Sequence, residues 1–339
     1  MKTKTLPPAD WNRAHLTTAL KAFQGTSVLV IGDVGLDRYT VGAVERISPE
    51  APVPIVRVTE EQHKLGLAAN VADNVAALAG KPRLTGLVGT DRVADDFRAV
   101  LTATGIDASD LVVDAKRRTI LKERVVSERQ QLLRVDYENT TPTDAATEEK
   151  LLRKISELLA RVDVVILQDY AKGLISERLA AHVFTEAKKS QRLVLVDPHE
   201  STPLSRYRGA NVLTPNRREA EALAGVRIED EKTLLNAGEK ILGATGGQHV
   251  FITLGKDGMA VFSAGALGAM TKIPTYAREV FDVSGAGDTV VSVLALALAT
   301  KASLEDAAVL ANLAAGVEVS KRGTATVTPA EILQAMEQF

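Results

Sequence analysis

The sequence predicts an α/β fold in which a doubly wound, mostly parallel sheet carries helices on both faces. Short runs rich in Val, Ile and Leu end in Gly, Asp or Pro, as buried parallel strands do. Helical patterns separate most of these runs, and such alternation favours parallel strands with crossover helices. The expected strands are SVLVIGD (27–33), RLTGLVG (83–89), VDVVILQ (162–168), RLVLVD (192–197), NVLTP (211–215) and HVFITLG (249–255).

The intervening helices are expected after Ala68, Asp91, Glu148 and Ser176, and a strongly apolar helix is expected from Val290. Two other segments, residues 39–58 and 119–138, alternate polar and apolar residues and contain turn signals. This pattern predicts antiparallel strands with one solvated face. We expect both to form a small β lid inserted in one domain spanning residues 1–339, although two functionless edge hairpins would show the same pattern.

Composition narrows the classes of function. With 41 basic and 43 acidic residues the formal charge is −2, which gives no electrostatic reason to expect nucleic acid or a membrane as partner. The absence of cysteine excludes disulfides and thiolate chemistry. The N-terminus shows no secretory signal, and the apolar run at 290–299 is too short to span a bilayer, so we expect a cytoplasmic protein.

The octapeptide DVSGAGDT, residues 282–289, is the segment most suggestive of chemistry. Gly285 and Gly287 allow a sharp turn close to a ligand, and the helix that follows presents N–H groups that favour an anion. Asp288 would then accept a proton from an attacking hydroxyl. The alternative is that Asp288 merely complements the helix dipole.

Other nucleotide-binding motifs are missing. No G-x-x-x-x-G-K-[ST] segment occurs, because Asp257 follows Gly255-Lys256, and no G-x-G-x-x-G follows the first strand. No paired histidine spacing indicates a zinc site. Nucleotide chemistry would therefore have to use the octapeptide.

DVSGAGDT resembles the C-terminal signature of the ribokinase-like (PfkB) carbohydrate kinases. Five further segments resemble that family in the same order: GDVGLD (32–37), LGLAANVADNVAAL (65–78), TPNRREAEAL (214–223), TLGKDG (253–258) and VLANLAAGVEVSKRGTATV (309–327). RISPEAPVP (46–54) is similar to the lid of the D-glycero-β-D-manno-heptose 7-phosphate kinases of lipopolysaccharide assembly. Many of these kinases are fused to a nucleotidyltransferase, and since this chain ends at Phe339 we expect the stand-alone form.

The resemblance implies that the γ-phosphate of Mg·ATP is transferred to the C1 hydroxyl of the heptose 7-phosphate. Asp288 would be the base, and the backbone of Gly285, Ala286 and Gly287 would form an anion hole. Asn216 and Glu219 would hold Mg²⁺ through its waters, although N-x-x-E is also a common helix-capping box. Other residues of the ATP and ion side would be Thr253, Gly255, Gly258, Asn312 and Gly323, with Asp282 and carbonyls of residues 321–324 around a monovalent cation such as K⁺.

On the sugar side the resemblance implies hydroxyl ligands, for which ordinary turn chemistry at strand ends is the alternative. These are Asp37 and Asn70, then Asp33 and Asp169, with Gly66 in the glycine-rich turn. The sugar phosphate needs cations, each of which could instead be a solvated surface charge: Arg46, Lys122, Arg124, Arg134 and Lys172.

Two departures from the family pattern fall on the sugar side. Leu67 replaces a glycine, which would cost roughly 1–2 kcal/mol if that position needs a positive φ. His199-Glu200 replaces Lys-Gly after the strand at 192–197. Another sugar or phosphosugar is therefore an open alternative, as is a non-catalytic sugar- or nucleotide-binding regulator. A homodimer formed through the lid is also expected.

Overall fold

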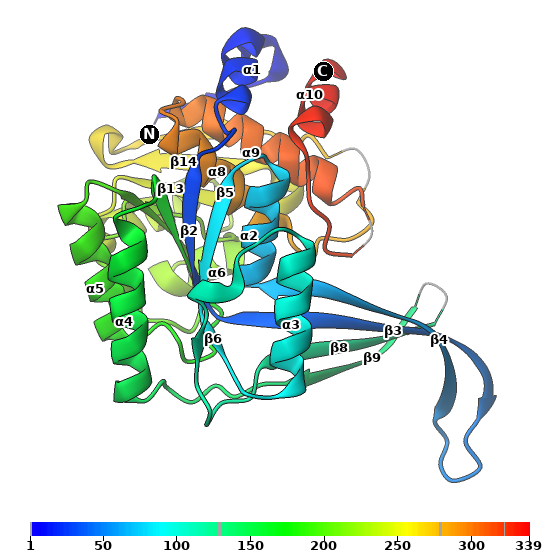
Figure 1. Ribbon diagram of the computed structural model, residues 1–339. Helices are drawn as coiled ribbons and strands as arrows, with labels where there is room; N and C mark the ends of the chain where they lie inside the picture. Colours follow the sequence, from blue (N-terminus) through cyan, green and yellow to red (C-terminus); the bar gives the residue numbers. More distant parts are fainter. Residues whose placement is uncertain (1, 128–129, 278–279, 322) are drawn as a thin grey trace.

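In the part of the chain that the structure describes, the central sheet has nine strands in a doubly wound arrangement (Figure 1). The structure, a computed structural model, describes residues 2–127, 130–277, 280–321 and 323–339. In spatial order the strands are β1 (Lys2–Thr5), β15 (Ala269–Ile273), β14 (Met259–Ser263), β13 (His249–Thr253), β12 (Val212–Leu213), β11 (Leu193–Asp197), β10 (Val164–Gln168), β2 (Ser27–Gly32) and β5 (Lys81–Thr85).

The strands from β13 to β5 are parallel, and β14 runs antiparallel to both of its neighbours. The six predicted strands are confirmed, with the run at 83–89 divided between β5 and the short β6 (Leu87–Val88), which pairs with β7 (Val112–Val113). The sequence analysis missed β1, β14 and β15. Only short 3₁₀ turns, and no α-helix, separate β13, β14 and β15 from one another, so the strand–helix alternation could not reveal β14 and β15.

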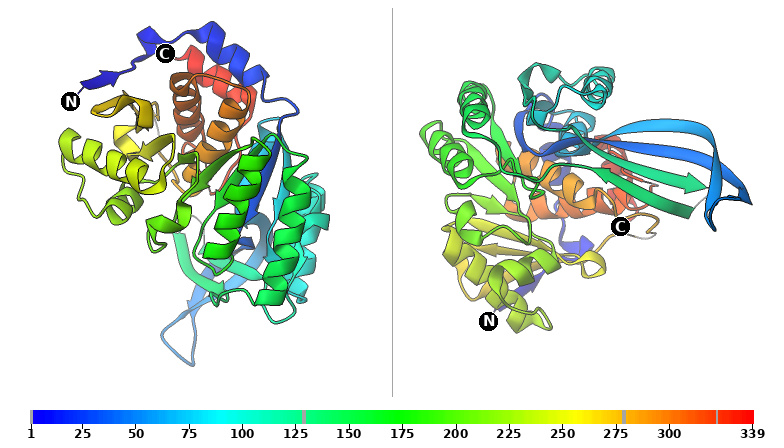
Figure 2. Two further views of the ribbon diagram at one scale, coloured as in Figure 1. Left: turned by 90° about the vertical axis from the view of Figure 1, so that its left-hand side faces the viewer. Right: turned by 90° about the horizontal axis from the view of Figure 1, so that it is seen from below.

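Helices cover both faces of the sheet (Figure 2). Along β2, Val28 and Val30 pack into one core cluster whereas Leu29 and Ile31 pack into the other, as the alternation of side chains along a strand requires. The first cluster contains α2 (Ala68–Ala77), α8 (Ala286–Ala299) and α9 (Leu304–Glu318). The second contains α4 (Ala145–Leu159), α5 (Glu177–Lys189) and α7 (Glu231–Thr245).

The remaining helices are shorter or peripheral. They are α1 (Arg13–Lys21), α3 (Arg92–Ala103), α6 (Arg217–Ala224) and α10 (Pro329–Glu337), and the 3₁₀ turns Pro8–Asp10, Ala108–Asp110, Leu204–Tyr207, Gly255–Asp257 and Ala264–Ala266. None of the helices in the described part of the chain has the length and apolar character needed to cross a membrane.

A second sheet, the lid, projects from one side of the molecule (Figures 1 and 2). Its order is β4 (Pro54–Leu67), β3 (Val34–Ile47), β8 (Ile120–Ser127) and β9 (Gln130–Tyr137). Each hairpin is antiparallel, as predicted, but β3 and β8 join the hairpins as a parallel pair. The first hairpin runs beyond residues 39–58 on both sides, and residues 128–129 of the second predicted segment lie outside the described residues.

Candidate functional site

Asp288 lies in the first turn of α8 and is only 9% exposed. One carboxylate oxygen accepts a hydrogen bond from Asn70 Nδ2 at 2.7 Å, and the other accepts one from the Tyr170 hydroxyl at 2.7 Å. Asn70 belongs to α2, and Tyr170 follows the carboxyl end of β10. Packing of three separate elements therefore orients this carboxylate.

The surroundings of Asp288 shift its pKa into a range that suits proton transfer. Burial raises the pKa of Asp288 to about 6, while the hydrogen bonds from Asn70 and Tyr170 and the charge of Lys122 oppose this increase. A carboxylate with a pKa near 6 is mostly ionised at neutral pH and is a stronger base than an ordinary aspartate. This property suits a general base.

Gly285 precedes α8 and has φ 98°, a conformation that favours glycine. A Cβ at Gly285 would stand 3.2 Å from Glu318 Oε1 and 3.3 Å from Asn70 Nδ2, so the turn is also tightly packed. Gly287, by contrast, has no heavy atom within 4 Å of a Cβ position. The N-terminus of α8 is thus supported on one side and open on the other, as an anion-binding helix end should be.

A cavity of about 380 Å³ adjoins this helix end. Its wall contains four of the residues predicted on the ATP and ion side, Thr253, Gly255, Gly258 and Asn312, together with Ala286 and Gly287. Most of the remaining wall is apolar, and Asn312 is held by a 3.0 Å hydrogen bond from its Nδ2 to the Pro274 carbonyl. An apolar slot with a few fixed polar groups suits a planar base.

The lid brings three of the predicted sugar-side residues together. In the β3–β8 pair Asp37 stands opposite Lys122, and Arg124 Nη1 forms a 3.0 Å ion pair with Asp37 Oδ1. The ammonium of Lys122 lies 5.8 Å from the centre of the Tyr170 ring, which connects the lid to Asp288. Burial lowers the pKa of Lys122, which forms no ion pair within the described residues. Lys122 is therefore an available cation whose charge acts on Asp288.

Of the other side chains predicted to bind the sugar phosphate, two are paired with carboxylates and one is exposed. Arg134 is paired with Asp136 at 2.8 Å, and Lys172 with Glu138 at 2.7 Å. Arg46 is exposed near the end of β3, nine residues beyond Asp37, or roughly 25–30 Å along the strand. The predicted contact of Arg46 with the sugar phosphate stays a prediction, and two bulges interrupt the pairing of β3 with β4 between Asp37 and Arg46.

Asp33 and Asp169 face the protein interior. The Asp33 oxygens accept the N–H groups of Lys172 and Leu174, and burial raises the pKa of Asp33 to about 6. Asp169 accepts hydrogen bonds from the Ala171 N–H and from the hydroxyls of Thr202 and Tyr207. Both carboxylates hold the loop after β10, and their predicted role as sugar-hydroxyl ligands stays a prediction. Gly66 lies beside Asp37, whose Cγ would be 3.1 Å from a Cβ at that position.

Asn216 and Glu219 form the capping box that the sequence left open as an alternative. Asn216 Oδ1 accepts the Glu219 N–H, and Glu219 Oε2 accepts the Asn216 N–H. Burial raises the pKa of Glu219 to about 7, and the pKa of nearby Asp197 is raised by burial and by the charges of Glu219 and Asp288. This concentration of acid groups suits a divalent cation bound through water and phosphate oxygens. Among the described residues, however, no three His, Asp or Glu side chains form a complete metal site.

The proposed cation loop lies against the octapeptide. Asp282 Oδ1 accepts the Ser284 N–H and Oδ2 accepts the Gly323 N–H at 3.2 Å. Residue 322, within the predicted 321–324 loop, lies outside the described residues. Burial raises the pKa of neighbouring Glu318 to about 8. Glu318 was not singled out from the sequence, where a lone Glu at a helix end is unremarkable.

Other groups at the site were also missed. Gln168 donates a 2.6 Å hydrogen bond to Asp197 and a longer one, 3.4 Å, to Asp288. Gln168 and Tyr170 lie in the segment ILQDYAKG (166–173), and Asp197 ends the strand RLVLVD (192–197). Their positions at strand ends were the available signal.

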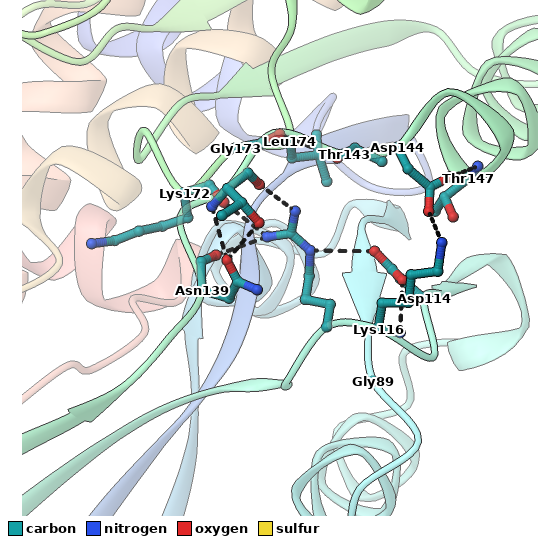
Figure 3. Close-up of polar contacts among 12 residues, drawn as sticks. Gly89, Asp114, Lys116, Asn139, Thr143, Asp144, Thr147, Lys172, Gly173 and Leu174 are labelled. Atoms are coloured by element: carbon teal, nitrogen blue, oxygen red, sulfur yellow. Dashed lines mark hydrogen bonds and ion pairs between the residues drawn. The ribbon is translucent and has the colours of Figure 1, made fainter.

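A buried arginine, Arg117, joins the lid to the loop after β10, and Figure 3 labels two of the residues whose carbonyl groups accept its hydrogen bonds, Asn139 and Lys172. Arg117 precedes β8, and its guanidinium donates to the carbonyl oxygens of Asn139, Thr141 and Lys172. Asn139 and Thr141 follow β9, whereas Lys172 follows Tyr170 along the loop after β10. Both ends of the β8–β9 hairpin are thereby joined to the loop that carries Tyr170.

Leu67 has φ 57° and ψ −137°, which places a leucine where glycine is favoured. The position does have the positive φ on which the expected cost of Leu67 was conditional, and its side chain is 6% exposed. We expect Leu67→Gly to be more stable than Leu67→Ala by about 1 kcal/mol, because both lose the side chain but only glycine relieves the backbone. Urea unfolding of the two variants measures this, and the usual order, with alanine more stable, would contradict it.

Comparisons with known proteins agree with this geometry. Residues 26–331 match the family model described as pfkB family carbohydrate kinase. The Bifunctional protein HldE of Geobacter metallireducens is 44% identical over 310 residues, which cover 91% of this chain and 63% of that protein. The HldE of Caulobacter vibrioides is 47% identical over 320 residues, with 94% and 64% covered. The chain therefore spans less than two thirds of the length of these relatives.

Solved structures show the same fold. Arabidopsis thaliana ribokinase, complexed with ribose and ATP, aligns with a TM-score of 0.72 at 19% identity over 93% of this chain and 99% of that one. Phosphofructokinase-2 from Escherichia coli, in complex with substrates and products, aligns with a TM-score of 0.76 at 18% identity and the same coverage. At these identities the likeness concerns the fold alone.

Proposed function

The chain belongs to the PfkB family of carbohydrate kinases, phosphotransferases that act on a sugar hydroxyl, and on this premise we propose the acceptor and the mechanism. The proposed reaction transfers the γ-phosphate of Mg·ATP to the C1 hydroxyl of D-glycero-β-D-manno-heptose 7-phosphate. The observation that supports it most directly is the position of Asp288. Its helix end forms part of the nucleotide-sized cavity, while Tyr170 links its carboxylate to the cationic lid.

In the proposed mechanism Asp288 accepts the proton of the attacking hydroxyl. The N–H groups at residues 285–287 face the negative charge that develops on the transferred phosphoryl group. Asn216 and Glu219 would hold Mg²⁺ through water, and a bound ion would supply positive charge against the phosphates. Asp282 would contribute to a monovalent cation site beside the same turn. Asp37 and Asn70 orient the sugar.

The phosphate of the proposed substrate is assigned to the lid cations. Lys122 and Arg124 lie on the same strand face as Asp37, since alternate residues of β8 share a face. Arg134 stands opposite Arg124 in the β8–β9 pair and extends this face. A sugar that bears a phosphate would match this positive surface, whereas a neutral sugar would leave Lys122 without an ionic partner.

ATP-dependent ADP release across a panel of sugars and phosphosugars tests the proposed acceptor. We expect the heptose 7-phosphate to give the highest kcat/KM and the unphosphorylated heptose to be far poorer. Turnover with another sugar alone would contradict the proposed acceptor and implicate Leu67 and His199 in a different pocket. Absence of turnover across the panel, with ATP still bound, would indicate a regulator.

The pKa of Asp288 predicts the pH dependence of the reaction. Asp288 must be ionised to act as a base, so kcat/KM should fall as the pH drops through about 6. Tyr170→Phe removes a hydrogen bond that lowers this pKa, so it should move the acidic limb to higher pH. A pH profile of both proteins measures the shift. An unchanged limb would show that Asp288 does not set it.

We also propose that the lid forms a homodimer. Four large apolar side chains are exposed on the projecting first hairpin, Val44, Ile47, Val53 and Val58. Burial of such a patch between two copies would remove apolar surface from water. Sedimentation at micromolar concentration should show a dimer, and a monomer there would contradict it.

A further inference from the structure

The backbone of Lys172 is held on both sides by buried charged side chains. Its N–H donates a 3.0 Å hydrogen bond to Asp33 Oδ2, and its carbonyl oxygen accepts a 3.0 Å hydrogen bond from Arg117 Nη1. Asp33 is 3% exposed and Arg117 is 7% exposed. Because hydrogen bonds to ionised groups are shorter and stronger than those between neutral groups, these two side chains determine where the loop after β10 lies.

The backbone of this loop needs such support. Ala171, which separates Tyr170 from Lys172, has φ 55°, in the left-handed region that an alanine rarely adopts. Gly173 has φ 94°, and a Cβ there would overlap the Thr141 carbonyl oxygen. A strained conformation of this kind persists only where the surrounding structure holds it. The position of Tyr170 therefore depends on the groups that hold the residues directly after it.

Arg117 also joins this loop to the lid. Its guanidinium donates to the carbonyl oxygens of Asn139 and Thr141, which follow β9, as well as to that of Lys172. β8, which carries Lys122, begins three residues after Arg117. One planar group thus fixes three carbonyl groups from two segments, a geometry that the fork of an arginine provides.

We propose that Arg117 is a positioning residue for phosphoryl transfer, because its hold on the Lys172 carbonyl keeps the Tyr170 hydroxyl hydrogen-bonded to Asp288. This inference rests on the proposed function, which makes Asp288 the base. Arg117 acts through the loop and not on the substrate. Its removal should therefore change the behaviour of Asp288 in the same way as removal of the Tyr170 hydroxyl.

The carboxylate of Asp288 reports the position of Tyr170. Burial raises the pKa of Asp288 to about 6, and the hydrogen bonds from Asn70 and Tyr170 lower it. Loss of the bond from Tyr170 would raise this pKa further, so Asp288 would take up its proton at higher pH. The other groups that interact with Asp288 come from the lid, from strand ends and from α9, and the test leaves them unchanged: Asp37, Lys122, Gln168, Asp197 and Glu318.

Arg117→Lys is the main variant, because lysine keeps the positive charge that acts on Asp33 but cannot reproduce the three-carbonyl fork. The titration of Asp288 is followed by carboxyl ¹³C NMR of aspartate-labelled protein without substrate, and its signal is identified by its absence in Asp288→Asn. We expect the midpoint in Arg117→Lys to lie at least about half a pH unit above that of the wild type, since complete loss of a hydrogen bond to a charged group would shift it by about 1–2 units.

Combination with Tyr170→Phe tests the route by which Arg117 acts. If the route is Tyr170, Arg117→Lys/Tyr170→Phe has the same midpoint as Tyr170→Phe alone, because the hydrogen bond is already absent. The acidic limb of kcat/KM should follow the same order. Should Arg117→Lys fail to fold, Gly173→Ala displaces the same loop with Arg117 intact, and it should also raise the midpoint.

Arg83→Lys is the matched control. Arg83 lies on β5, the edge strand of the central sheet, and its Nε donates a 2.7 Å hydrogen bond to the buried Asp110 carboxylate. The same substitution there also removes a guanidinium from a buried acceptor. We expect it to lower stability but to leave the Asp288 midpoint at the wild-type value.

Three results would overturn the inference. They are an unchanged midpoint in Arg117→Lys, an equal rise in Arg83→Lys, and additive rises in the double variant, which would show that Arg117 acts by a route other than Tyr170. Because the titration uses no substrate, the role of Arg117 and the proposed reaction can fail separately.

Discussion

Asp288→Asn is expected to lower kcat at least ~10²-fold, because asparagine keeps the shape of the side chain but cannot accept the proton of the attacking hydroxyl. ATP affinity should change little, since Asp288 itself is absent from the wall of the nucleotide-sized cavity. Steady-state kinetics and equilibrium ATP binding measure the two effects. Near-normal turnover would refute the role of Asp288 as the base.

Asp163→Asn provides the same chemical change at a different edge of the sheet. Asp163 immediately precedes β10 and accepts hydrogen bonds from the backbone N–H and hydroxyl of Ser27. Asp288 lies beyond the opposite, carboxyl end of that strand, beside Tyr170. The control variant is expected to lose some stability but to keep the wild-type kcat.

Gly258→Ala is expected to destabilise the protein by at least about 3 kcal/mol and to weaken ATP binding. Gly258 has φ 86°, and a Cβ added there would overlap the Ile273 carbonyl oxygen, so β14 and β15 would have to separate. The same residue lines the nucleotide-sized cavity. Urea unfolding and equilibrium ATP titration measure the two consequences.

Gly255→Ala is the matched control for that substitution. Gly255 lines the same cavity and also has a positive φ, 59°, but no heavy atom lies within 4 Å of a Cβ position. The expected cost is therefore only the backbone term of roughly 1–2 kcal/mol. Equal losses in the two variants would show that steric overlap at Gly258 is not the cause.

The parallel strands and the position of Asp288 at a helix start could be predicted because both depend on local patterns. The partners of Asp288 could not, since Asn70 and Tyr170 come from elements that meet only when α2, α8 and β10 pack together. For the lid, too, the local pattern predicted the elements but not the contacts between them. Alternation of polar and apolar residues predicted its strands, but the parallel pairing that sets Asp37 opposite Lys122 is a long-range contact.

The carboxylates near strand ends show why residue type alone does not predict the contacts of a side chain. Asp33 follows β2, Asp169 follows β10 and Asp37 lies within β3, and of these three only Asp37 forms an ion pair with a lid cation. The other two accept hydrogen bonds within the loop after β10, and this direction depends on the backbone of that loop. Conversely, Glu318 has no local sequence signal, and its raised pKa appears only through burial.

The most direct test of the central claim is to locate the new phosphate by ³¹P NMR after incubation of the protein with Mg·ATP and D-glycero-β-D-manno-heptose 7-phosphate. The proposed mechanism predicts a second phosphate on C1, formed by the wild type and not by Asp288→Asn under the same conditions. A phosphate on another hydroxyl, or an unchanged sugar beside an active reaction with a different acceptor, would contradict it.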